Sequence, residues 1–189
     1  MKKTILSAAF FVVSVATSFA QTWSLDKSHA GLSFTITHMM ISDVDGKFKN
    51  FDAKVTSSKA DFSDAVFELT ADASSINTDN EMRDGHLKGA DFFDVEKFPK
   101  VIYKSTSFKK VADKKYVLSG NLTMHGVTKP VTLNVTLNGP VENPRSKKQM
   151  IGLKATGTVK RSDFGISTMP EAALSNEIEI RANGEFVKD

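Results

Sequence analysis

Histidine is the residue type in this chain with the widest capacity for chemistry, because imidazole binds metals and moves protons near neutral pH. The four histidines are His29, His38, His86 and His125. A compact metal site usually shows His-x-His, or two histidines four residues apart on a helix, and none of these pairs has either spacing. The chain also has no cysteine, so thiol catalysis and cysteine ligands are excluded. We therefore expect no metal site and no cofactor.

Other reactive arrangements are also missing from the sequence. It contains no Gly-x-Ser-x-Gly nucleophile elbow and no glycine-rich phosphate loop. The acidic residues are scattered, and Glu177 and Glu179 alternate along an apolar segment as ordinary surface charge does. Nothing pairs a nucleophile with a base. We expect no catalytic residues and interpret the protein as a non-enzymatic one.

The elements that must position any functional residue are runs in which apolar and polar residues alternate. The clearest is segment 131–137, VTLNVTL, and a period of two is typical of a half-buried β-strand. Eight such strands joined mostly by short turns predict an all-β fold, a closed eight-stranded antiparallel barrel whose interior is packed or holds one small ligand. The predicted strands cover residues 32–38, 47–57, 65–73, 101–108, 116–124, 131–137, 151–159 and 177–186. The polar segments 125–130 and 138–149 are predicted to connect strands.

One predicted connection, residues 74–100, is much longer than the others. Thr78 and Glu81 have the spacing of a capping box, which predicts a short helix over residues 79–87. The next segment contains Phe92, Phe93 and Phe98, and burial of one such side chain stabilises a fold by about 1.5–3 kcal/mol. We interpret this segment as a lid that packs over one end or side of the barrel.

The first twenty residues have the pattern of a secretory signal peptide. Lys2 and Lys3 precede an apolar stretch from residue 5 to residue 16, and Ser18 and Ala20 are small residues at the positions that a signal peptidase reads. The stretch is too short to span a bilayer. We expect cleavage near Ala20, a barrel domain over residues 21–189 without a transmembrane segment, and a periplasmic or secreted location.

The charge of the chain argues against a nucleic-acid partner. Without Lys2 and Lys3 the remaining chain has 23 basic and 22 acidic residues. A nucleic-acid-binding protein usually concentrates basic residues on one face. The one basic cluster here, Arg145, Lys147 and Lys148, lies in a segment with Pro144 and is interpreted as a solvated loop.

Small residues recur on the predicted inward face of the barrel. Two interpretations remain open: the small residues leave space for a cavity, or the glycines among them mark bends at barrel corners. His38 continues the apolar face of its strand, and it is either a satisfied core or strand-end residue or a polar contact for a ligand. The small inward residues are Ala71, Ala73, Gly120, Ala155, Gly157, Ala182 and Gly184.

Four stretches of this sequence together resemble the YceI-like family, bacterial polyisoprenoid-binding proteins with a lipocalin-like barrel. The most distinctive are the run from Arg83 to Pro99 and the segment His125-Gly126-Val127-Thr128-Lys129-Pro130. The resemblance covers essentially the whole chain after residue 20. The stretches are residues 25–48, including LDKSH and VDGKF; 75–99, including RDGHL and DFFDVEKFP; 120–131, GNLTMHGVTKPV; and 161–180, including RSDFG and EIEI.

The resemblance implies a lipocalin-like barrel with a tunnel that holds a long-chain isoprenoid, a quinone-like molecule or a fatty amphiphile. It implies that His38 contacts the ligand's polar head, while His29, Arg83 and His86 are assigned structural roles beside turns. Phe92, Phe93 and Phe98 belong to the lid. The tunnel lining implied by the resemblance and by strand parity is Leu32, Phe34, Ile36, His38, Leu69, Leu118, Gly120, Leu122, Leu133, Val135, Leu153, Ala155, Gly157, Ile178 and Ile180.

Two hypotheses of different classes follow. In the first, the protein carries a lipid inside a hollow barrel. In the second, the barrel is packed solid, and the protein has a structural or interaction role in the cell envelope without a small ligand. The volume left inside the barrel distinguishes the two.

Overall fold

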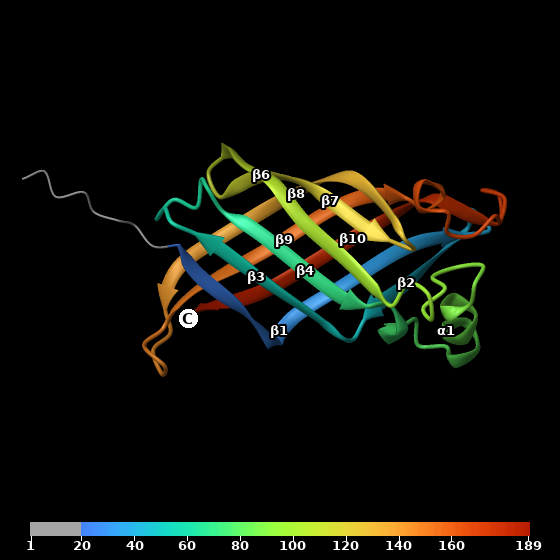
Figure 1. Cartoon of the computed structure of the whole chain (residues 1–189), viewed down its shortest axis with the longest axis horizontal. Helices are drawn as coiled ribbons and strands as arrows, with labels where there is room; N and C mark the ends of the chain where they lie inside the picture. Colours follow the sequence, from blue (N-terminus) through green and yellow to red (C-terminus); the bar gives the residue numbers. More distant parts are fainter. Residues whose placement is uncertain (1–19) are drawn as a thin grey trace, which may run out of the picture.

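Hydrogen bonds close ten antiparallel strands into a barrel in the computed structural model, which describes residues 20–189 (Figure 1). The strand order around the sheet is β10-β9-β8-β7-β6-β4-β3-β1-β2-β5, and β10 also pairs with β1. The predicted signal peptide, apart from Ala20, lies outside the described residues. The strands are β1 Gln21–His38, β2 Ser42–Phe48, β3 Phe51–Ser57, β4 Val66–Asp72, β5 Ile76–Asn77, β6 Lys100–Ala112, β7 Lys115–Met124, β8 Val127–Glu142, β9 Gln149–Lys160 and β10 Leu174–Lys188.

The long strand β1 closes the barrel on both of its edges. One edge pairs with β10 from Trp23 to His38. The other edge pairs with β3 up to Ser24 and with β2 from Ser33 onward, so β2 replaces β3 along the barrel. A cross-section therefore contains eight strands, and the predicted eight-stranded antiparallel barrel is confirmed.

Two strand predictions are corrected by the structure. The strand predicted over 32–38 begins at Gln21, because the register shift between Asp26 and Ala30 interrupts its alternation. The strand predicted over 47–57 is two strands, β2 and β3, separated at Lys49 and Asn50. Figure 1 shows the bend of β1 at the lower edge of the barrel. The connection between β2 and β3 lies at the same edge.

Several local boundaries also differ from the predictions. Helix α1 runs over Glu81–Lys88, and its N-cap is Asn80, whose side chain accepts a hydrogen bond from the Arg83 amide at 3.0 Å, in place of Thr78. The turn predicted over 125–130 contracts to His125 and Gly126, whose positive φ angles of 51° and 73° suit a two-residue hairpin. Strand β8 also extends into the segment predicted as a loop after residue 137, ending at Glu142. No helix within residues 20–189 is long and apolar enough to cross a bilayer.

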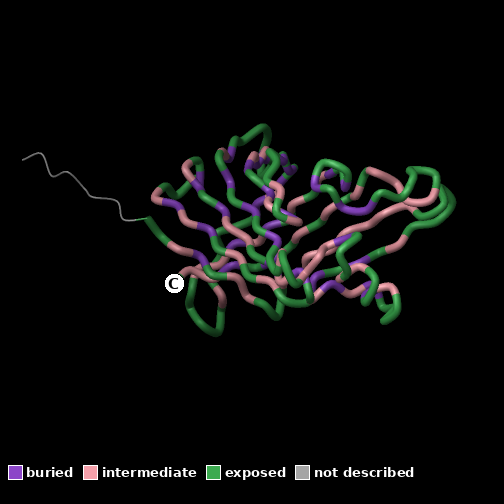
Figure 2. Tube along the Cα trace, turned by 45° about the vertical axis from the view of Figure 1, so that its right-hand side comes forward, coloured by how far each residue is buried: buried purple, intermediate pink, exposed green. Residues whose placement is uncertain are grey.

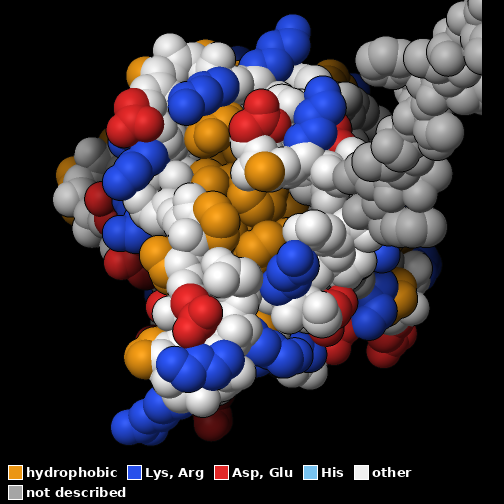
Figure 3. All heavy atoms as spheres, turned by 90° about the vertical axis from the view of Figure 1, so that its left-hand side faces the viewer, with side chains coloured by type: hydrophobic (Ala, Val, Ile, Leu, Met, Phe, Trp, Pro, Cys, Tyr) orange, Lys and Arg blue, Asp and Glu red, His pale blue; other side chains and the backbone are white. Residues whose placement is uncertain are grey.

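Large side chains fill the barrel at the end where β1 begins and β10 ends, here called the terminal end. Aromatic rings pack there with centroid separations of 5.4 Å for Trp23–Phe62, 4.7 Å for Phe67–Phe108 and 4.3 Å for the stacked pair Phe108–Tyr116. Figure 3 views the molecule from this side and shows hydrophobic side chains in the centre of the face, surrounded by charged ones. Other buried side chains of this end are Val55, Val135, Leu137, Ile151 and Phe186.

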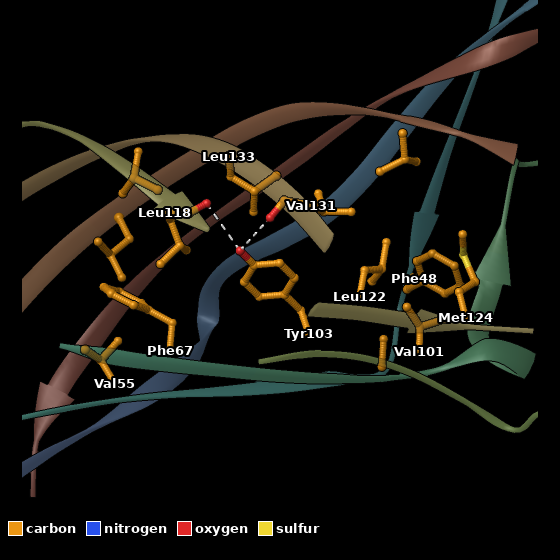
Figure 4. Close-up of a cluster of buried hydrophobic side chains, with 14 of the residues drawn as sticks. Phe48, Val55, Phe67, Val101, Tyr103, Leu118, Leu122, Met124, Val131 and Leu133 are labelled. Carbon is orange, nitrogen blue, oxygen red and sulfur yellow. Dashed lines mark hydrogen bonds between the residues drawn. The ribbon is translucent and has the colours of Figure 1, made fainter. Parts of the chain in front are cut away.

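Tyr103 crosses the interior near the middle of the barrel (Figure 4). Its hydroxyl donates to the backbone carbonyls of Leu118 and Val131, each at 3.3 Å, and desolvation raises the pKa of Tyr103 to about 12. In Figure 4, Phe67 lies to one side of this ring and Met124 to the other. The phenol therefore ties β6 to β7 and β8 between the packed end and the opposite end, here called the helix end because α1 lies there.

Candidate ligand-binding cavity

A cavity of about 450 Å³ occupies mainly the half of the barrel toward the helix end and extends as far as Leu25, Phe67 and Phe186. That volume is within the range of small-molecule sites. The wall comes from all eight barrel strands together with β2, α1 and the segments that follow α1 and β9. Predicted residues that line the cavity are Leu32, Phe34, Ile36, His38, Leu69, Leu118, Leu122, Leu133, Leu153, Ala155, Ile178 and Ile180, together with Phe92 and Phe93 of the predicted lid.

Several inward-pointing apolar residues of β1 and β10 along this half are only partly buried. Phe34 and Ile36 on β1, and Ile178 and Ile180 on β10, pack against the core but retain intermediate exposure. At the terminal end, by contrast, Val55 on β3 and Ile151 on β9 are 0% and 1% exposed and do not border the cavity. Figure 2 shows the same change, with fewer fully buried positions along the strands toward the helix end. These side chains therefore pack against the core on one side and border open space on the other.

Three residues predicted to line a tunnel do not border the cavity, and their assignment is corrected. Val135 is 3% exposed within the packed half. A Cβ at Gly120 would lie 2.5 Å from the Tyr103 ring, and one at Gly157 would lie 2.6 Å from Leu133 Cδ2. The small size of these glycines therefore accommodates large side chains that lie against the barrel wall. Close packing is thus a third explanation for small inward residues, in addition to space for a cavity and bends at barrel corners.

Sequence reasoning missed part of the wall. Val44 and Phe48 of β2 border the cavity, and their alternation within 44–48 was a usable signal. Ile166, Met169 and Leu174 also border it. The segment from 165 to 173 has no strand periodicity, so no local pattern predicted the contacts of Ile166 and Met169.

The cavity reaches solvent at the helix end. His38, His86 and Met169 line it and are also exposed to solvent. His38 thus lies where the cavity opens, while its contact with a ligand head group stays a prediction. His86 lies edge-on to Phe92, with ring centroids 4.8 Å apart.

A buried arginine holds one side of this mouth together. Arg161 is 4% exposed, and its guanidinium donates to carbonyls before and within the start of β10. Its Nη1 donates to Ser167 O at 2.7 Å, its Nη2 to Leu174 O at 2.9 Å, and its Nε to Ser175 O at 3.1 Å. Ile166 and Met169 carbonyls also accept from it. This one side chain therefore satisfies the backbone carbonyl acceptors of the irregular segment before β10 and of the first residues of that strand.

A buried aspartate anchors α1 on the other side of the mouth. The Asp84 carboxylate accepts hydrogen bonds from the Thr78 hydroxyl at 2.6 Å, the Thr78 amide at 2.7 Å and Asn77 Nδ2 at 3.2 Å. Burial opposes ionisation of Asp84, but these hydrogen bonds outweigh it and lower its pKa. Arg83 donates from Nη2 to the Thr78 carbonyl at 2.8 Å, a contact of the kind that its predicted structural role involves.

Asp84→Asn is expected to destabilise the protein by about 1.5–3 kcal/mol at pH 7, because a hydrogen bond to a charged group is worth that much. The folded-state pKa lies below the unfolded value of about 3.9, so the stabilisation is present above that value and is lost as pH falls through the folded pKa. Denaturant unfolding of both proteins between pH 7 and pH 3 measures this. The difference in free energy of unfolding between the two proteins should become smaller in acid. A difference that does not change with pH contradicts the prediction. Asp113→Asn, at an exposed turn, is the control.

The predicted lid packs in two different ways. Phe92 and Phe93 line the cavity, and the Phe93 ring meets Phe48 edge-on with centroids 5.8 Å apart. Phe98 instead packs on the β7–β8 turn, 4.9 Å from the His125 ring. Phe98 therefore holds this segment to the β7–β8 turn and does not border the cavity.

A second hollow, of about 490 Å³, lies where β1 separates from β3 beyond Ser24. Leu25, Ala53, Leu69 and Tyr103 line both this hollow and the main cavity. The barrel wall is therefore thin along this side.

Charged side chains bridge the strands beside this hollow. Glu68 pairs with Lys54 at 2.7 Å and with Lys104 at 2.9 Å, and these hydrogen bonds, led by the one from Lys54, lower the pKa of Glu68. Lys27 pairs with Asp52 at 3.2 Å across the gap between β1 and β3. Exposed pairs of this kind contribute little to stability, at most about 1 kcal/mol each.

His29 lies in a small ion-paired group at the β1 bulge. Its Nδ1 is 2.9 Å from Asp26 Oδ2 and 3.8 Å from Glu185 Oε2. The hydrogen bond with Asp26 raises the pKa of His29 and lowers that of Asp26. The structural role predicted for His29 thus involves a carboxylate, not a backbone carbonyl. Glu185 was not identified from the sequence because only the pairing of β1 with β10 brings it close.

The fold and the cavity define a closed antiparallel barrel with an apolar interior compartment. The family model of the YceI-like domain matches residues 23–186. The chain belongs to the YceI-like family.

Similar proteins agree with this assignment. The chain is 37% identical over 169 residues to UPF0312 protein SA2479 of Staphylococcus aureus strain N315, covering 87% of this chain and 96% of that protein. The crystal structure of a Campylobacter jejuni YceI protein is similar with a TM-score of 0.71 and 28% identity, over 81% of this chain and 90% of that one. A polyisoprenoid binding domain from Saccharophagus degradans shares the fold, with a TM-score of 0.64 and 16% identity, over 88% and 98% of the two chains.

Proposed function

We propose that this protein binds a long apolar chain in the cavity and carries it without chemical change. The ligand is an isoprenoid or a similar amphiphile, such as a quinone or a fatty amide. The observation that carries this proposal is the compartment of about 450 Å³, which is lined by apolar side chains, those on β1 and β10 being only partly buried. The polyisoprenoid binding domain named among the similar structures supports the same ligand class.

The free energy available from such a compartment is sufficient for tight binding. Burial of each methylene-sized group contributes about 0.8 kcal/mol, so a chain of about ten carbons gains about 8 kcal/mol before ordering costs. The wall selects by length and width, so we expect tolerance among lipid types. The polar end of the ligand is placed at the helix end, beside His38. The packed-barrel description applies to the terminal end, where aromatic side chains fill the interior.

We also propose that the protein is exported to the periplasm or secreted after removal of residues 1–20. The basis is the basic start, the apolar stretch and the Ser18–Ala20 pair. The export proposal is independent of the barrel and its cavity.

One experiment tests both proposals. Native mass spectrometry of protein isolated from the cell envelope gives the chain mass and the mass of any bound lipid, and the delipidated protein is then titrated with a polyprenyl phosphate, a quinone and a fatty amide. We expect a chain that begins at Gln21 and binding in the micromolar range or tighter to at least one lipid. A mass that retains residues 1–20 contradicts export. Absence of co-purified lipid and of binding to all three contradicts the carrier function.

A further inference from the structure

Exposed apolar side chains gather at the end of the barrel where the cavity opens. On the β1–β2 turn, Met40 and Ile41 are 62% and 87% exposed. Met82 on α1 is 88% exposed. Together with Met39 and Met169, which are also exposed, these five residues form what we call the mouth patch. Exposed apolar side chains that cluster in this way usually mark an interaction site.

The backbone of the β1–β2 turn presents these side chains to solvent. Met39 and Met40 have φ angles of 53° and 60°, a region that L-residues other than glycine, asparagine and aspartate rarely adopt. The Met39 amide donates to Ala173 O at 2.9 Å and the Ile41 amide to His38 O at 3.2 Å. The turn is therefore bonded to the segment before β10, and two adjacent strained residues point large apolar side chains outward.

The mouth patch is continuous with the cavity. Met169 belongs to the patch and also lines the cavity. His38, which precedes Met39, lines the cavity too, and so does Arg83, which follows Met82. The cavity therefore opens among the residues of the patch, and in Figure 1 the β1–β2 turn and α1 lie at the same end of the barrel.

We propose that the mouth patch docks this end of the barrel on the surface of a lipid bilayer. This inference rests on the proposed function, because an apolar chain that moves from a membrane into the cavity would otherwise have to cross water. Methionine suits such a contact, since its flexible and polarisable side chain adapts to irregular apolar surroundings. The charges near the patch are mixed, with Glu81 and Glu171 as well as Arg83 and Lys88. The apolar side chains therefore supply the attraction, and salt has little effect on it.

The test compares two double variants of the chain from residue 21 onward, which contains every strand of the barrel. Residues 1–20 are left out because their apolar stretch would itself bind lipid. Met40→Asp/Ile41→Asp alters the mouth patch at two positions that do not line the cavity. Val111→Asp/Val141→Asp is the matched control, since these valines are 63% and 61% exposed at the terminal end. Flotation with phosphatidylcholine vesicles measures docking, and transfer of a fluorescent polyprenyl lipid from vesicles to protein measures the consequence.

We expect Met40→Asp/Ile41→Asp to lower vesicle binding at least tenfold and to slow lipid transfer by a similar factor. The control should stay within about twofold of the unmodified protein in both measurements. Equal vesicle binding by all three proteins overturns the proposal. So does a concentration-dependent dimer that the patch variant abolishes, because the patch is then an interface between copies.

Failure of docking and failure of the proposed function are distinguishable. Lipid binding is measured separately by equilibrium titration without vesicles, in which the patch variant should match the unmodified protein within twofold. An unmodified protein that binds lipid in this titration but does not float with vesicles overturns docking alone. Vesicle binding through the patch without lipid binding in the titration supports docking and contradicts the carrier function.

Discussion

Ala155→Trp is expected to reduce the affinity for a long-chain lipid by about 100-fold or more while the protein still folds. Ala155 lies on β9 between Val135 and Ala182, and its side chain borders the cavity with intermediate exposure. An indole at this position would fill space that the ligand needs. Exclusion of about four methylene groups costs roughly 3 kcal/mol, which corresponds to more than a hundredfold in the dissociation constant.

The matched control for this change lies two residues further along the same face of the same strand. Gly157 does not border the cavity, and in Gly157→Leu the new side chain lies first against Leu133, because a Cβ there already lies 2.6 Å from Leu133 Cδ2. Overpacking should destabilise this variant by about 1–3 kcal/mol. Lipid titration and denaturant unfolding of both variants separate the effects. If Ala155→Trp binds lipid as the unmodified protein does, the cavity is not the binding site.

Arg161→Ala is expected to lower the free energy of unfolding by about 3–5 kcal/mol. The substitution removes the shared donor of the carbonyls of Ile166, Ser167, Met169, Leu174 and Ser175, and hydrogen bonds to a charged group are worth about 1.5–3 kcal/mol each before non-additivity. For a domain of this size the melting temperature should fall by roughly 6–20 °C. The irregular segment before β10 depends most directly on this side chain.

Two further variants sharpen this prediction. Arg161→Lys should recover less than half of the lost stability, because one ammonium group cannot reproduce the planar fork of donors. Arg145→Ala, in the exposed β8–β9 loop, should change stability by no more than about 0.5 kcal/mol. Thermal and denaturant unfolding measure the stability of all three variants. A loss below about 1 kcal/mol for Arg161→Ala would show that the segment is held by its other contacts.

Sequence periodicity alone determined the architecture of this protein. Alternation over segments such as 131–137 requires one face of each strand to be buried, and an antiparallel series of eight such strands buries those faces most simply by closing. Phe92 and Phe93 were assigned to a lid for an equally local reason, since adjacent phenylalanines in a long connection need an apolar surface to cover. What periodicity could not locate were the breaks at residues 26–30 and 49–50, which depend on how β1 changes partner from β3 to β2.

Only the tertiary structure decided which half of the barrel is hollow. Gly120 and Ala155 are both small inward residues, but the Tyr103 ring covers the first and open space lies beside the second. The space beside a small residue is set by the side chain that strand register places opposite it, and register is a non-local property. The same holds for Arg161, whose carbonyl partners lie mostly in a segment without periodicity. Alternation along one strand determines the direction in which a side chain points, whereas the packing of neighbouring strands determines whether the space it faces is filled.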